Sequence, residues 1–394
     1  MEPEQILNHR LSNYRRVLAD RNLDALLLTN FWAESPQGGD YNIVFLARLL
    51  KRYIFSFLIL TQEDCGVWVE ADDLPRAQKE SWLGTVEALP PGEQWGYSGA
   101  EFAGLAAAQI RNLVAKDRLR IGYDGRYLPG SIAIALRELG VHLEEVSLDL
   151  EQSKLIKDAL ELKQMRGAAA IVDRGIARVM ELVREGVSEI DLAAAAEAEM
   201  RTAGAECFWW KTLLASGPAA EDWFDTPTQR KIQRGDVVLM DFTPVFNGYG
   251  GDIARTFVLG QPTSDQRDVW NLAKAALDAA VAVLRDGVSL GELMQAGVDV
   301  VRGSPYERFY IGTGHTIGLY SHVYPIFLSS IEKMKTIPRS VLDTRMRTDM
   351  VAAMEVIITV PGLGGFRLED SYLVQAHGAE KLTQAPMVMS LETR

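Results

Sequence analysis

The rhythm of apolar and polar positions changes near the middle of the chain, and this change predicts two domains. Up to residue 150, short apolar runs alternate with segments in which apolar residues recur at helical spacing. Short apolar runs predict buried strands, so this order indicates an α/β unit. The expected elements are a helix over 4–21, strands at 24–28, 53–60 and 66–70, a helix over 101–115, a strand at 119–123, a helix over 131–139 and a strand at 141–146.

From Glu151 to Arg184 the chain is rich in residues that favour helix, and no proline interrupts them. This run predicts a long helix and ends the alternating pattern. We therefore expect an α/β domain over residues 1–151 and an α+β domain over residues 152–394. A chain of 394 residues is long enough to give each domain its own core.

The second domain contains a short repeated motif. Arg184–Ser188 reads REGVS, and Arg285–Ser289 reads RDGVS. Each copy follows a helical pattern and starts another helix, because Ser188–Asp191 and Ser289–Glu292 have the spacing of a capping box. We expect the first of these helices to end near Gly204.

After the repeated motif, each half ends in apolar strands that hold two acidic residues. These are Asp241 and Asp252 in the first half, and Glu355 and Glu369 in the second. The same order of elements in both halves indicates duplication and an internal pseudo-twofold repeat. Four carboxylates would then lie around one pseudo-symmetry axis.

The acids of the first half lie on two apolar runs joined by Asn247-Gly248. This dipeptide accepts the two positive φ angles of a type I′ turn, so a β-hairpin is expected. Asp241 would then pair with Ala254, and Asp252 would lie on the same face as Asp241. Two carboxylates on one face suit a divalent cation, whereas the alternative is an exposed acidic face. The apolar run VVLMDF favours the metal site, because burying an unpaired carboxylate is costly.

Composition narrows the possible partners. Hydrophobic residues make up 47% of the chain and charged residues 24%, as in ordinary globular proteins. The net charge of −12 argues against nucleic acid or an anionic membrane as a partner. No apolar run is long enough to span a bilayer, and the polar start MEPEQILNHR does not resemble a secretory signal. Cys65 and Cys207 form neither a disulfide framework nor a CxxC site, which favours a cytoplasmic location.

The chain has only five histidines, so any metal site must depend mainly on carboxylates. His315 and His322 lie in the glycine-rich stretch GTGHTIGLYSH, whose glycines let the backbone approach a ligand closely. A lone histidine in such a stretch is more often structural. Beside four acidic residues, one of the two becomes a candidate metal ligand.

Taken together, these motifs resemble metallopeptidase family M24, the group of creatinase, prolidase and aminopeptidase P. The similarity covers nearly the whole chain. YRRVLADRNLDALLLT resembles the start of the creatinase-type N-terminal domain, and KDALELKQMRGAAAIVDRG resembles the helix that opens the catalytic domain. The resemblance implies a creatinase-like α/β domain followed by an α+β catalytic domain with the pita-bread fold and its pseudo-twofold repeat.

The resemblance also implies the residues of the site. The matching motifs are two aspartates followed by ARTF, the GTGH stretch, the acid in MEVIITVPG, and GFRLED. His322 matches a histidine that contacts substrate, and Arg367 matches the arginine before the last ligand; with Glu355, these are the implied catalytic residues. By position, the implied metal ligands are Asp241, Asp252, His315, Glu355 and Glu369.

Four carboxylates and one imidazole suit two divalent metal ions, with Mn²⁺ preferred and Fe²⁺, Co²⁺ or Zn²⁺ as alternatives. Such a pair would activate a shared water for attack on a carbonyl. We expect Glu355 to pass the proton to the leaving nitrogen and His322 to stabilise the oxyanion.

One departure from the family concerns the substrate pocket. Peptidases of this family usually carry a further histidine upstream of the first aspartate, where this chain has Phe224 or Asp225. The loss of a donor puts ordinary peptide hydrolysis in question. Aromatic residues also gather in this region, partly as core and partly as pocket wall. The expected substrate-binding residues are Trp210, Trp223, Phe224, Asp225 and Tyr320.

Two other segments attract attention. Val323–Thr348 is longer than is usual in the resembling family, and it is either a lid or a surface insertion. Asn30–Arg48 holds Trp32, Glu34 and Asp40 in a loop without an evident partner in its own domain. This loop and the resemblance predict a homodimer in which the loop approaches the active site of the other chain.

The leading functional hypothesis is a metal-dependent hydrolase that cleaves a C–N bond in a dipeptide or small molecule, such as an Xaa-Pro peptide or an amide. One alternative is a non-peptidase enzyme of the same fold, either a lyase resembling those that act on dimethylsulfoniopropionate or a metal-free creatinase-like enzyme. A second alternative is a non-catalytic binding module. The complete set of five ligands argues against the binding module.

Overall fold

The computed structural model describes residues 3–31, 40–50, 53–92 and 96–392. The chain divides into two compact units, Met1–Lys154 and Leu155–Arg394, which are described separately. That these units are independent domains, with the boundary that the sequence places near residue 152, stays a prediction. Among the described residues, no helix is both long and apolar enough to cross a membrane.

The first unit is built on a mixed sheet with the strand order β4-β3-β2-β1-β5-β6. β1 lies in the interior of the sheet, where it pairs antiparallel with β2 and parallel with β5. The strands are β1 (Ala25–Phe31), β2 (Phe55–Leu60), β3 (Cys65–Val69), β4 (Thr85–Ala88), β5 (Arg120–Tyr123) and β6 (His142–Glu145).

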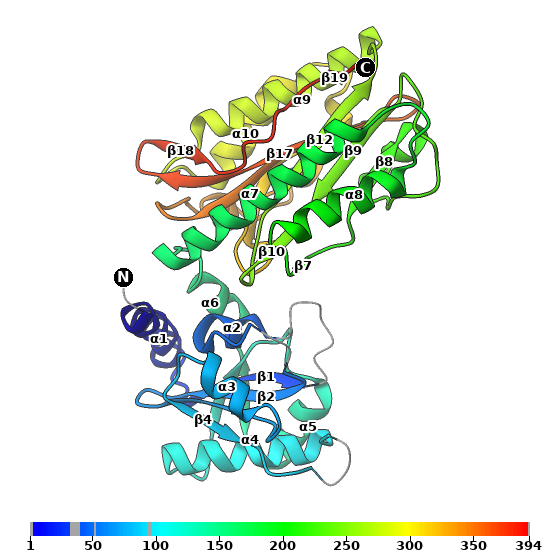
Figure 1. Cartoon of the computed structure of the whole chain (residues 1–394). Coiled ribbons are helices and arrows are strands. Elements are labelled where there is room, and N and C mark those ends of the chain that lie inside the picture. Colours follow the sequence, from blue (N-terminus) through cyan, green and yellow to red (C-terminus); the bar gives the residue numbers. More distant parts are fainter. Residues whose placement is uncertain (1–2, 32–39, 51–52, 93–95, 393–394) are drawn as a thin grey trace. The chain divides into compact units, whose positions relative to one another are not determined.

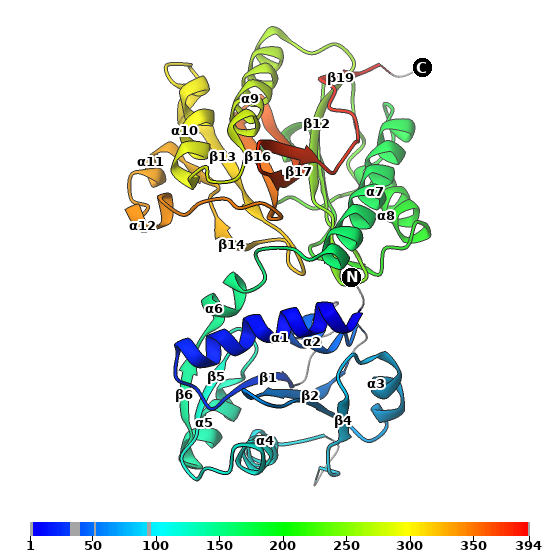
Figure 2. The same cartoon turned by 90° about the vertical axis from the view of Figure 1, so that its left-hand side faces the viewer.

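Helices cover both faces of this sheet. α1 and α2 lie on one face, and α4 and α5 lie on the other (Figures 1 and 2). Phe102 and Ile110 of α4 pack in one core with Leu27, Phe57 and Ile59 of the sheet. The helices are α1 (Pro3–Asp20), α2 (Tyr41–Ala47), α3 (Leu74–Glu80), α4 (Gly99–Val114), α5 (Gly130–Glu138) and α6 (Ser147–Gln152).

The elements expected from the sequence pattern are all present, but the pattern missed α2, α3, α6 and β4. The missed helices have six or seven residues, which is too short to show a helical period. The expectation for the loop Asn30–Arg48 needs a correction. Trp32 and Glu34 lie outside the described residues, but Asp40 and Tyr41 are buried at the start of α2. The described part of this loop therefore has partners within its own unit.

The second unit contains two helix pairs, α7 with α8 and α9 with α10, which lie on the outside of its strands (Figure 2). The run expected as one helix from Glu151 to Arg184 is interrupted, because Asp158 caps a new helix together with Glu161. The helices are α7 (Ala159–Leu182), α8 (Glu189–Thr202), α9 (Ser264–Val283), α10 (Leu290–Val301), α11 (Ile331–Met334) and α12 (Arg339–Leu342), with 3-10 turns η1 (Gly217–Glu221) and η2 (Glu307–Phe309).

Two main sheets form the interior of this unit. One has the order β19-β12-β9-β8, the other has the order β14-β13-β16-β17-β18, and β15 also pairs with β13. A small third sheet has the order β11-β10-β7. The strands are β7 (Cys207–Phe208), β8 (Leu213–Ser216), β9 (Val237–Phe242), β10 (Pro244–Phe246), β11 (Tyr249–Gly250), β12 (Ile253–Leu259), β13 (Tyr310–Thr316), β14 (Val323–Ile326), β15 (Ser329–Ser330), β16 (Val351–Val360), β17 (Gly364–Gln375), β18 (Gly378–Lys381) and β19 (Ser390–Leu391).

The hairpin predicted in the first half is confirmed. Asn247 and Gly248 have φ angles of 50° and 84°, as the type I′ turn requires. Asp241 pairs with Ala254 in the ladder between β9 and β12. The hairpin is divided between two sheets, however, because its tip joins the small sheet with β7.

The internal repeat is also confirmed by matching contacts in the two halves. Gly186 donates to the Ile232 carbonyl at 2.8 Å, and Gly287 donates to the Met346 carbonyl at 2.8 Å. Ser188 forms a bridge with Lys231, and Ser289 forms a bridge with Arg345. Both serines cap the following helix, although only Ser289 forms the complete capping box with Glu292. The two halves therefore share backbone contacts as well as a sequence motif.

Alternation along the strands turns the acidic residues toward the space between the two main sheets. On β9, Val238 and Met240 pack with α7 and α8, so Asp241 points to the opposite face. On β16, Met354 and Val356 pack with α9 and α10, which places Glu355 on the inner face. The acidic side chains are thus directed inward by two separate hydrophobic cores.

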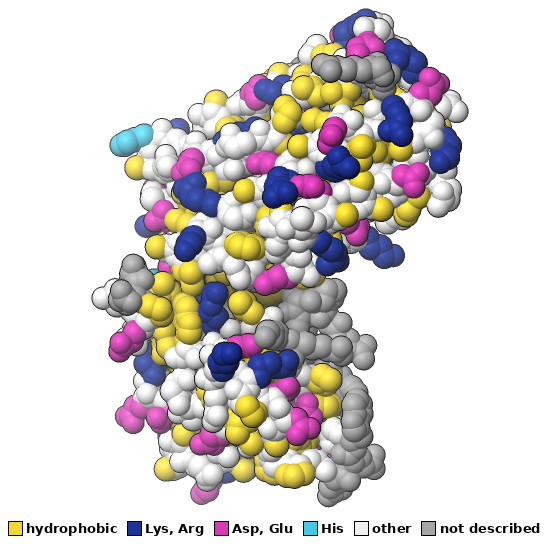
Figure 3. All heavy atoms as spheres, viewed as in Figure 1, with side chains coloured by type: hydrophobic (Ala, Val, Ile, Leu, Met, Phe, Trp, Pro, Cys, Tyr) yellow, Lys and Arg dark blue, Asp and Glu magenta, His cyan; other side chains and the backbone are white. Residues whose placement is uncertain are grey.

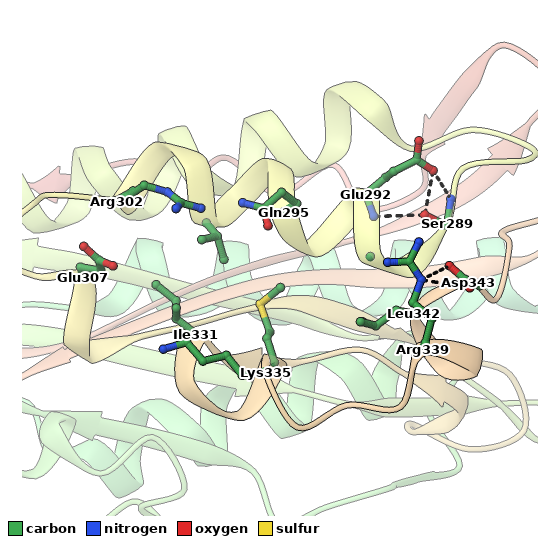
Figure 4. A pocket seen from close by; sticks show the side chains of 13 residues that line it. Ser289, Glu292, Gln295, Arg302, Glu307, Ile331, Lys335, Arg339, Leu342 and Asp343 are labelled. Atoms are coloured by element: carbon green, nitrogen blue, oxygen red, sulfur yellow. Dashed lines mark hydrogen bonds and ion pairs between the residues drawn. The ribbon is translucent and has the colours of Figure 1, made fainter.

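The segment Val323–Thr348 is folded rather than extended over the sheet. β14 pairs with β13, while Ile331 and Leu342 pack against the core that α10 shares. Between α10 and α11–α12 lies a cleft of about 610 Å³, lined by residues such as Gln295 and Lys335 (Figure 4). None of the five expected metal ligands lines this cleft. Residues 331–342 are therefore part of the outer surface next to α10.

Charged side chains are mixed over the described surface seen in Figure 3, where Lys and Arg lie among Asp and Glu. Many of them form pairs, such as Arg166 with Glu380 and Arg174 with Glu199. The net charge of −12 is therefore not gathered into one acidic patch on this face.

Candidate metal centre

Five strand regions of the second unit bring the predicted ligands together. Asp241 lies on β9, Asp252 directly before β12, His315 on β13, Glu355 on β16 and Glu369 on β17. Glu355 pairs directly with Glu369 across β16 and β17. His315 pairs with Ala353, two residues before Glu355, so His315 and Glu355 share the inner face. All five side chains are buried.

Three of these residues form a tight cluster. His315 Nε2 lies 3.4 Å from Glu369 Oε1 and 4.0 Å from Asp252 Oδ2. One potential ligand atom from each of Asp252, His315 and Glu369 lies within 4.8 Å of the others. Two carboxylates and an imidazole at this spacing can surround a divalent cation.

Several buried polar atoms of the site have no hydrogen-bond partner among the described residues. They include both ring nitrogens of His315, both carboxylate oxygens of Glu369, Asp241 Oδ1 and Glu355 Oε2. Buried polar atoms are normally paired, so this concentration requires a ligand. Oxygen and imidazole donors fit divalent metal ions, and the residues present are therefore suited to hold them.

Electrostatics supports the same requirement. Burial raises the pKa of Asp241, Asp252 and Glu369, and repulsion from neighbouring carboxylates raises it further. Buried carboxylates held this close are unfavourable when ionised. Positive charge between them reverses this effect, because it stabilises the ionised form that also serves as a metal ligand.

Arg367 on β17 supplies positive charge to one side of the site. Its Nη1 lies 2.7 Å from Asp241 Oδ2, and its Nε donates to Glu355 Oε1. Burial opposes the charged form, but Asp241 and Glu355 hold the pKa of Arg367 above its ordinary value. Asp241 and Glu355 are thus paired with a guanidinium, whereas among the described residues Asp252 and Glu369 lie close to His315 and form no ion pair with an arginine or lysine.

His322 stacks on His315, with ring centroids 3.9 Å apart and an interplanar angle of 22°. The rings of Trp210 and His322 meet edge to face with centroids 5.7 Å apart, and Trp210 remains 53% exposed. Burial, together with His315 and Arg367, lowers the pKa of His322 to about 3. His322 is therefore neutral near pH 7 and carries one ring N–H that can be donated.

An aromatic pair lies on the Arg367 side of the site. Arg367 Nη1 donates to the Trp223 carbonyl at 3.4 Å, and its guanidinium lies 5.8 Å from the centroid of the Trp223 ring. Phe224 stacks on Trp223 with centroids 4.2 Å apart and is 62% exposed. Trp210 and Trp223 thus contact different members of the site, His322 and Arg367.

The other two expected substrate-binding residues have local contacts. The Asp225 carboxylate accepts a hydrogen bond from the Thr226 N–H within its own loop. Tyr320 packs against the hydrophobic core, and its carbonyl accepts from Gly318. Their assignment to a substrate pocket stays a prediction.

Two neighbouring residues of the ARTF motif, to which the sequence assigned no role, join the two sheets behind the site. Thr256 Oγ1 donates to the Arg367 carbonyl and accepts from the Arg367 N–H, both at 3.0 Å. Arg255 donates to the Glu369 carbonyl and to Asp370. A buried arginine inside the apolar run IARTFVL was the available signal, since a buried charge needs partners.

Comparison with known proteins gives a family-level match. Residues 163–376 match the model of metallopeptidase family M24. The chain is 25% identical over 359 residues to the Xaa-Pro dipeptidase of Pyrococcus furiosus, covering 86% of this chain and 93% of that protein. It is 28% identical over 312 residues to a putative dipeptidase of Bacillus subtilis, covering 72% of this chain and 83% of that protein.

The fold is shared with solved structures. The Xaa-Pro dipeptidase from Bacillus anthracis matches with a TM-score of 0.84 and 23% identity, and the match covers 98% of this chain and 100% of that one. Prolidase from Pyrococcus furiosus matches with a TM-score of 0.78 and 23% identity, and the match covers 94% of this chain and 99% of that one. The expected architecture, an α/β N-terminal unit followed by a pita-bread unit, is therefore confirmed.

Proposed function

Because this chain belongs to metallopeptidase family M24, we propose that it is a metal-dependent hydrolase that cleaves the C–N bond of an Xaa-Pro dipeptide or a similar small amide. The observation that carries the proposal is the buried cluster of Asp252, His315 and Glu369, whose potential ligand atoms lie within 4.8 Å. The names of the curated relatives, an Xaa-Pro dipeptidase and a putative dipeptidase, support the substrate class.

We propose that Asp241, Asp252, His315, Glu355 and Glu369 together hold two divalent ions, with Mn²⁺ preferred over Fe²⁺, Co²⁺ or Zn²⁺. Four carboxylates balance the charge of two such ions, and the oxygen-rich set suits Mn²⁺. When bound, the ions supply an activated water and polarise the carbonyl of the substrate. Arg367 already pairs with Asp241 and Glu355. Metal binding on that side therefore requires these two carboxylates to interact with Arg367 and with a metal ion at the same time.

Two side chains have positions suited to proton transfer. Glu355 Oε2 is buried without a hydrogen-bond partner among the described residues, so it is available to take a proton from water and deliver it to the leaving nitrogen. His322 is neutral, and its Nδ1 lies 3.1 Å from Ser321 Oγ. This contact leaves Nε2 for the oxyanion of the substrate when Nε2 carries the proton.

Metal analysis and kinetics test this function together. Purified protein should contain divalent metal, and removal of the metal should abolish hydrolysis of Xaa-Pro dipeptides. Readdition of Mn²⁺ should restore hydrolysis. Full activity in a metal-free preparation would contradict the proposal and favour the creatinase-like alternative.

A second candidate function is a non-peptidase reaction on a specialised small molecule, including a lyase reaction on a sulfonium acid. The specific observation is that half-buried Trp223 packs against exposed Phe224, in the segment where peptidases of the family usually carry a histidine. Aromatic faces bind compact apolar or cationic groups. A substrate panel that includes dipeptides, small amides and sulfonium acids separates the two functions.

We further propose that the protein acts in the cytoplasm as a homodimer. Family resemblance supports the dimer, and the segment around Trp32, which lies outside the described residues, is where the sequence places the contact. Light scattering coupled to size exclusion should give twice the chain mass of 43.7 kDa. A monomer with full activity would contradict this assembly.

A further inference from the structure

Glu189, the first residue of α8, makes four hydrogen bonds although it is completely buried. Its Oε1 accepts from the backbone N–H of Ser216 at 2.8 Å and from Ser216 Oγ at 2.6 Å. Its Oε2 accepts from the backbone N–H of Thr228 at 3.0 Å and from Thr228 Oγ1 at 2.6 Å. One carboxylate therefore holds both ends of residues 217–227, which we call the aromatic segment.

The aromatic segment reaches the candidate metal centre. It carries Trp223, whose carbonyl and ring contact Arg367, and Phe224, which stacks on Trp223. Its first half lies against β17, because a side chain at Gly365 would meet the Ala220 carbonyl. Glu221 Oε1 also accepts from the Gly362 N–H at 2.8 Å.

The pseudo-twofold repeat shows that the fold alone does not require a carboxylate at this position. The residue that corresponds to Glu189 in the second half is Leu290, directly after the capping serine in both cases. The backbone contacts agree, since Glu189 N–H donates to the Arg230 carbonyl and Leu290 N–H donates to the Thr344 carbonyl. Leu290 is equally buried, and it packs in the hydrophobic core.

Burying a carboxylate is costly unless it is fully hydrogen-bonded, whereas a leucine at the same place contributes favourable burial. The half with the carboxylate is the half that contains the aromatic segment. The four hydrogen bonds from Ser216 and Thr228, which flank this segment, offset the cost of burying Glu189.

We propose that Glu189 is a positioning residue that fixes the aromatic segment so that Trp223 holds Arg367 against Asp241 and Glu355. The effect of this role on substrate rests on the proposed function, because Trp223 and Phe224 would form the wall that substrate contacts. The set of hydrogen bonds by which Glu189 holds the two ends of the aromatic segment, which we call the clamp, does not depend on the reaction.

Glu189→Gln tests the clamp, because an amide NH₂ replaces one oxygen that accepts two hydrogen bonds. One end of the aromatic segment then faces a donor in place of an acceptor. Hydrogen exchange of the backbone amides in residues 217–227 should become at least about tenfold faster, while exchange in α10 stays at the wild-type rate. Thr228→Val removes one of the four hydrogen bonds to Glu189, together with the one that Thr228 Oγ1 accepts from the Arg230 N–H. It should give a smaller change of the same kind, should Glu189→Gln fold poorly.

The functional consequence is measured as coupling with Trp223. With an Xaa-Pro dipeptide, Glu189→Gln should lower kcat/KM about 10- to 100-fold, mainly through KM, and leave the metal content unchanged. In a Trp223→Ala background the same substitution should change kcat/KM by less than about threefold. Glu292→Gln is the matched control, since it removes a capping carboxylate in the second half and should change neither readout.

Unchanged exchange in residues 217–227 of Glu189→Gln would overturn the proposal. Equal losses of kcat/KM in the wild-type and Trp223→Ala backgrounds would overturn it as well, because the carboxylate would then serve general stability. If the wild-type protein cleaves no dipeptide, the proposed function fails and the exchange experiment decides the clamp by itself.

Discussion

Glu355 and Glu369 are direct partners across β16 and β17, but their carboxylates have different surroundings. The Glu355 carboxylate accepts a hydrogen bond from Arg367 Nε, whereas the Glu369 carboxylate lies 3.4 Å from His315 Nε2 and has no hydrogen-bond partner among the described residues. The guanidinium therefore divides the site into a side that carries its own positive charge and a side that depends on a bound cation.

Asp252→Asn should abolish metal binding and lower kcat/KM by at least about 10³-fold, because it removes one charge from the cluster with His315 and Glu369. The metal-free variant should be as stable as the metal-free wild type or more stable, since a repulsive buried carboxylate is lost. Elemental analysis and thermal unfolding measure the two effects.

The control for this variant is Asp278→Asn, an exposed residue that pairs with Lys274 on α9. It should retain metal and activity. Wild-type metal content in Asp252→Asn would contradict the assignment of Asp252 as a ligand.

Thr256→Val should destabilise the second unit by about 1–3 kcal/mol, because both the N–H and the carbonyl of Arg367 lose their buried partner. The substitution keeps the shape of the side chain, so packing is preserved. Thr359→Val on β16 is the matched control, since Thr359 Oγ1 is buried without a hydrogen-bond partner among the described residues. Chemical denaturation should show a large difference between the two variants, and equal stabilities would contradict the importance of this junction.

Asp40 should make the stability of the first unit depend on pH. Burial, followed by repulsion from Asp124, raises the pKa of Asp40 to about 7. A raised carboxyl pKa means that the folded state holds its proton longer than the unfolded state. The contribution of Asp40 to the free energy of unfolding is therefore fully present below about pH 4 and is lost as the pH rises through 7. The total loss is on the order of 2–4 kcal/mol.

Asp40→Asn removes this dependence. The amide oxygen can still accept from the Asn42 N–H as the N-cap of α2, so the fold of the helix is retained. Unfolding by urea at pH 5 and pH 8 should show a smaller pH effect in the variant than in the wild type. The same slope in both proteins would show that Asp40 titrates normally.

Ordinary Xaa-Pro dipeptides should be hydrolysed slowly. Phe224 or Asp225 stands where the family usually has a histidine, and the loss of one oxyanion donor typically costs ~10²–10³ in rate. A compact apolar or cationic substrate should be turned over faster, because Trp223 and Phe224 offer aromatic faces. A dipeptide panel decides this, since a kcat/KM of ~10⁴–10⁸ M⁻¹s⁻¹ would show that the missing histidine is unimportant.

Much of the site could be predicted because its geometry is local in sequence. The turn at Asn247-Gly248 determines the register of its hairpin, and the period of two along a strand then determines which residues share a face with Asp241. The repeated motif at Ser188 and Ser289 likewise follows from helix capping, which depends on a few neighbouring residues.

Other features depended on contacts between distant parts of the chain. Arg367 was expected near the last ligand, but its pairing with Asp241 joins strands from different halves of the unit. The short helix α2 was missed, because seven residues carry too little periodicity to outweigh a loop-like composition.

The amino-acid sequence by itself determined most strands of the first unit, the caps at Ser188 and Ser289 and the register of the hairpin, while the family resemblance supplied the five candidate ligands. The strands, caps and register depend on backbone preferences and on alternation, which act over a few residues. Only the tertiary structure decided that Arg367 neutralises Asp241 and Glu355, that Thr256 joins β12 to β17, and that Glu189 holds both ends of the aromatic segment. Those contacts depend on how two separately packed sheets meet, and no local pattern carries that information.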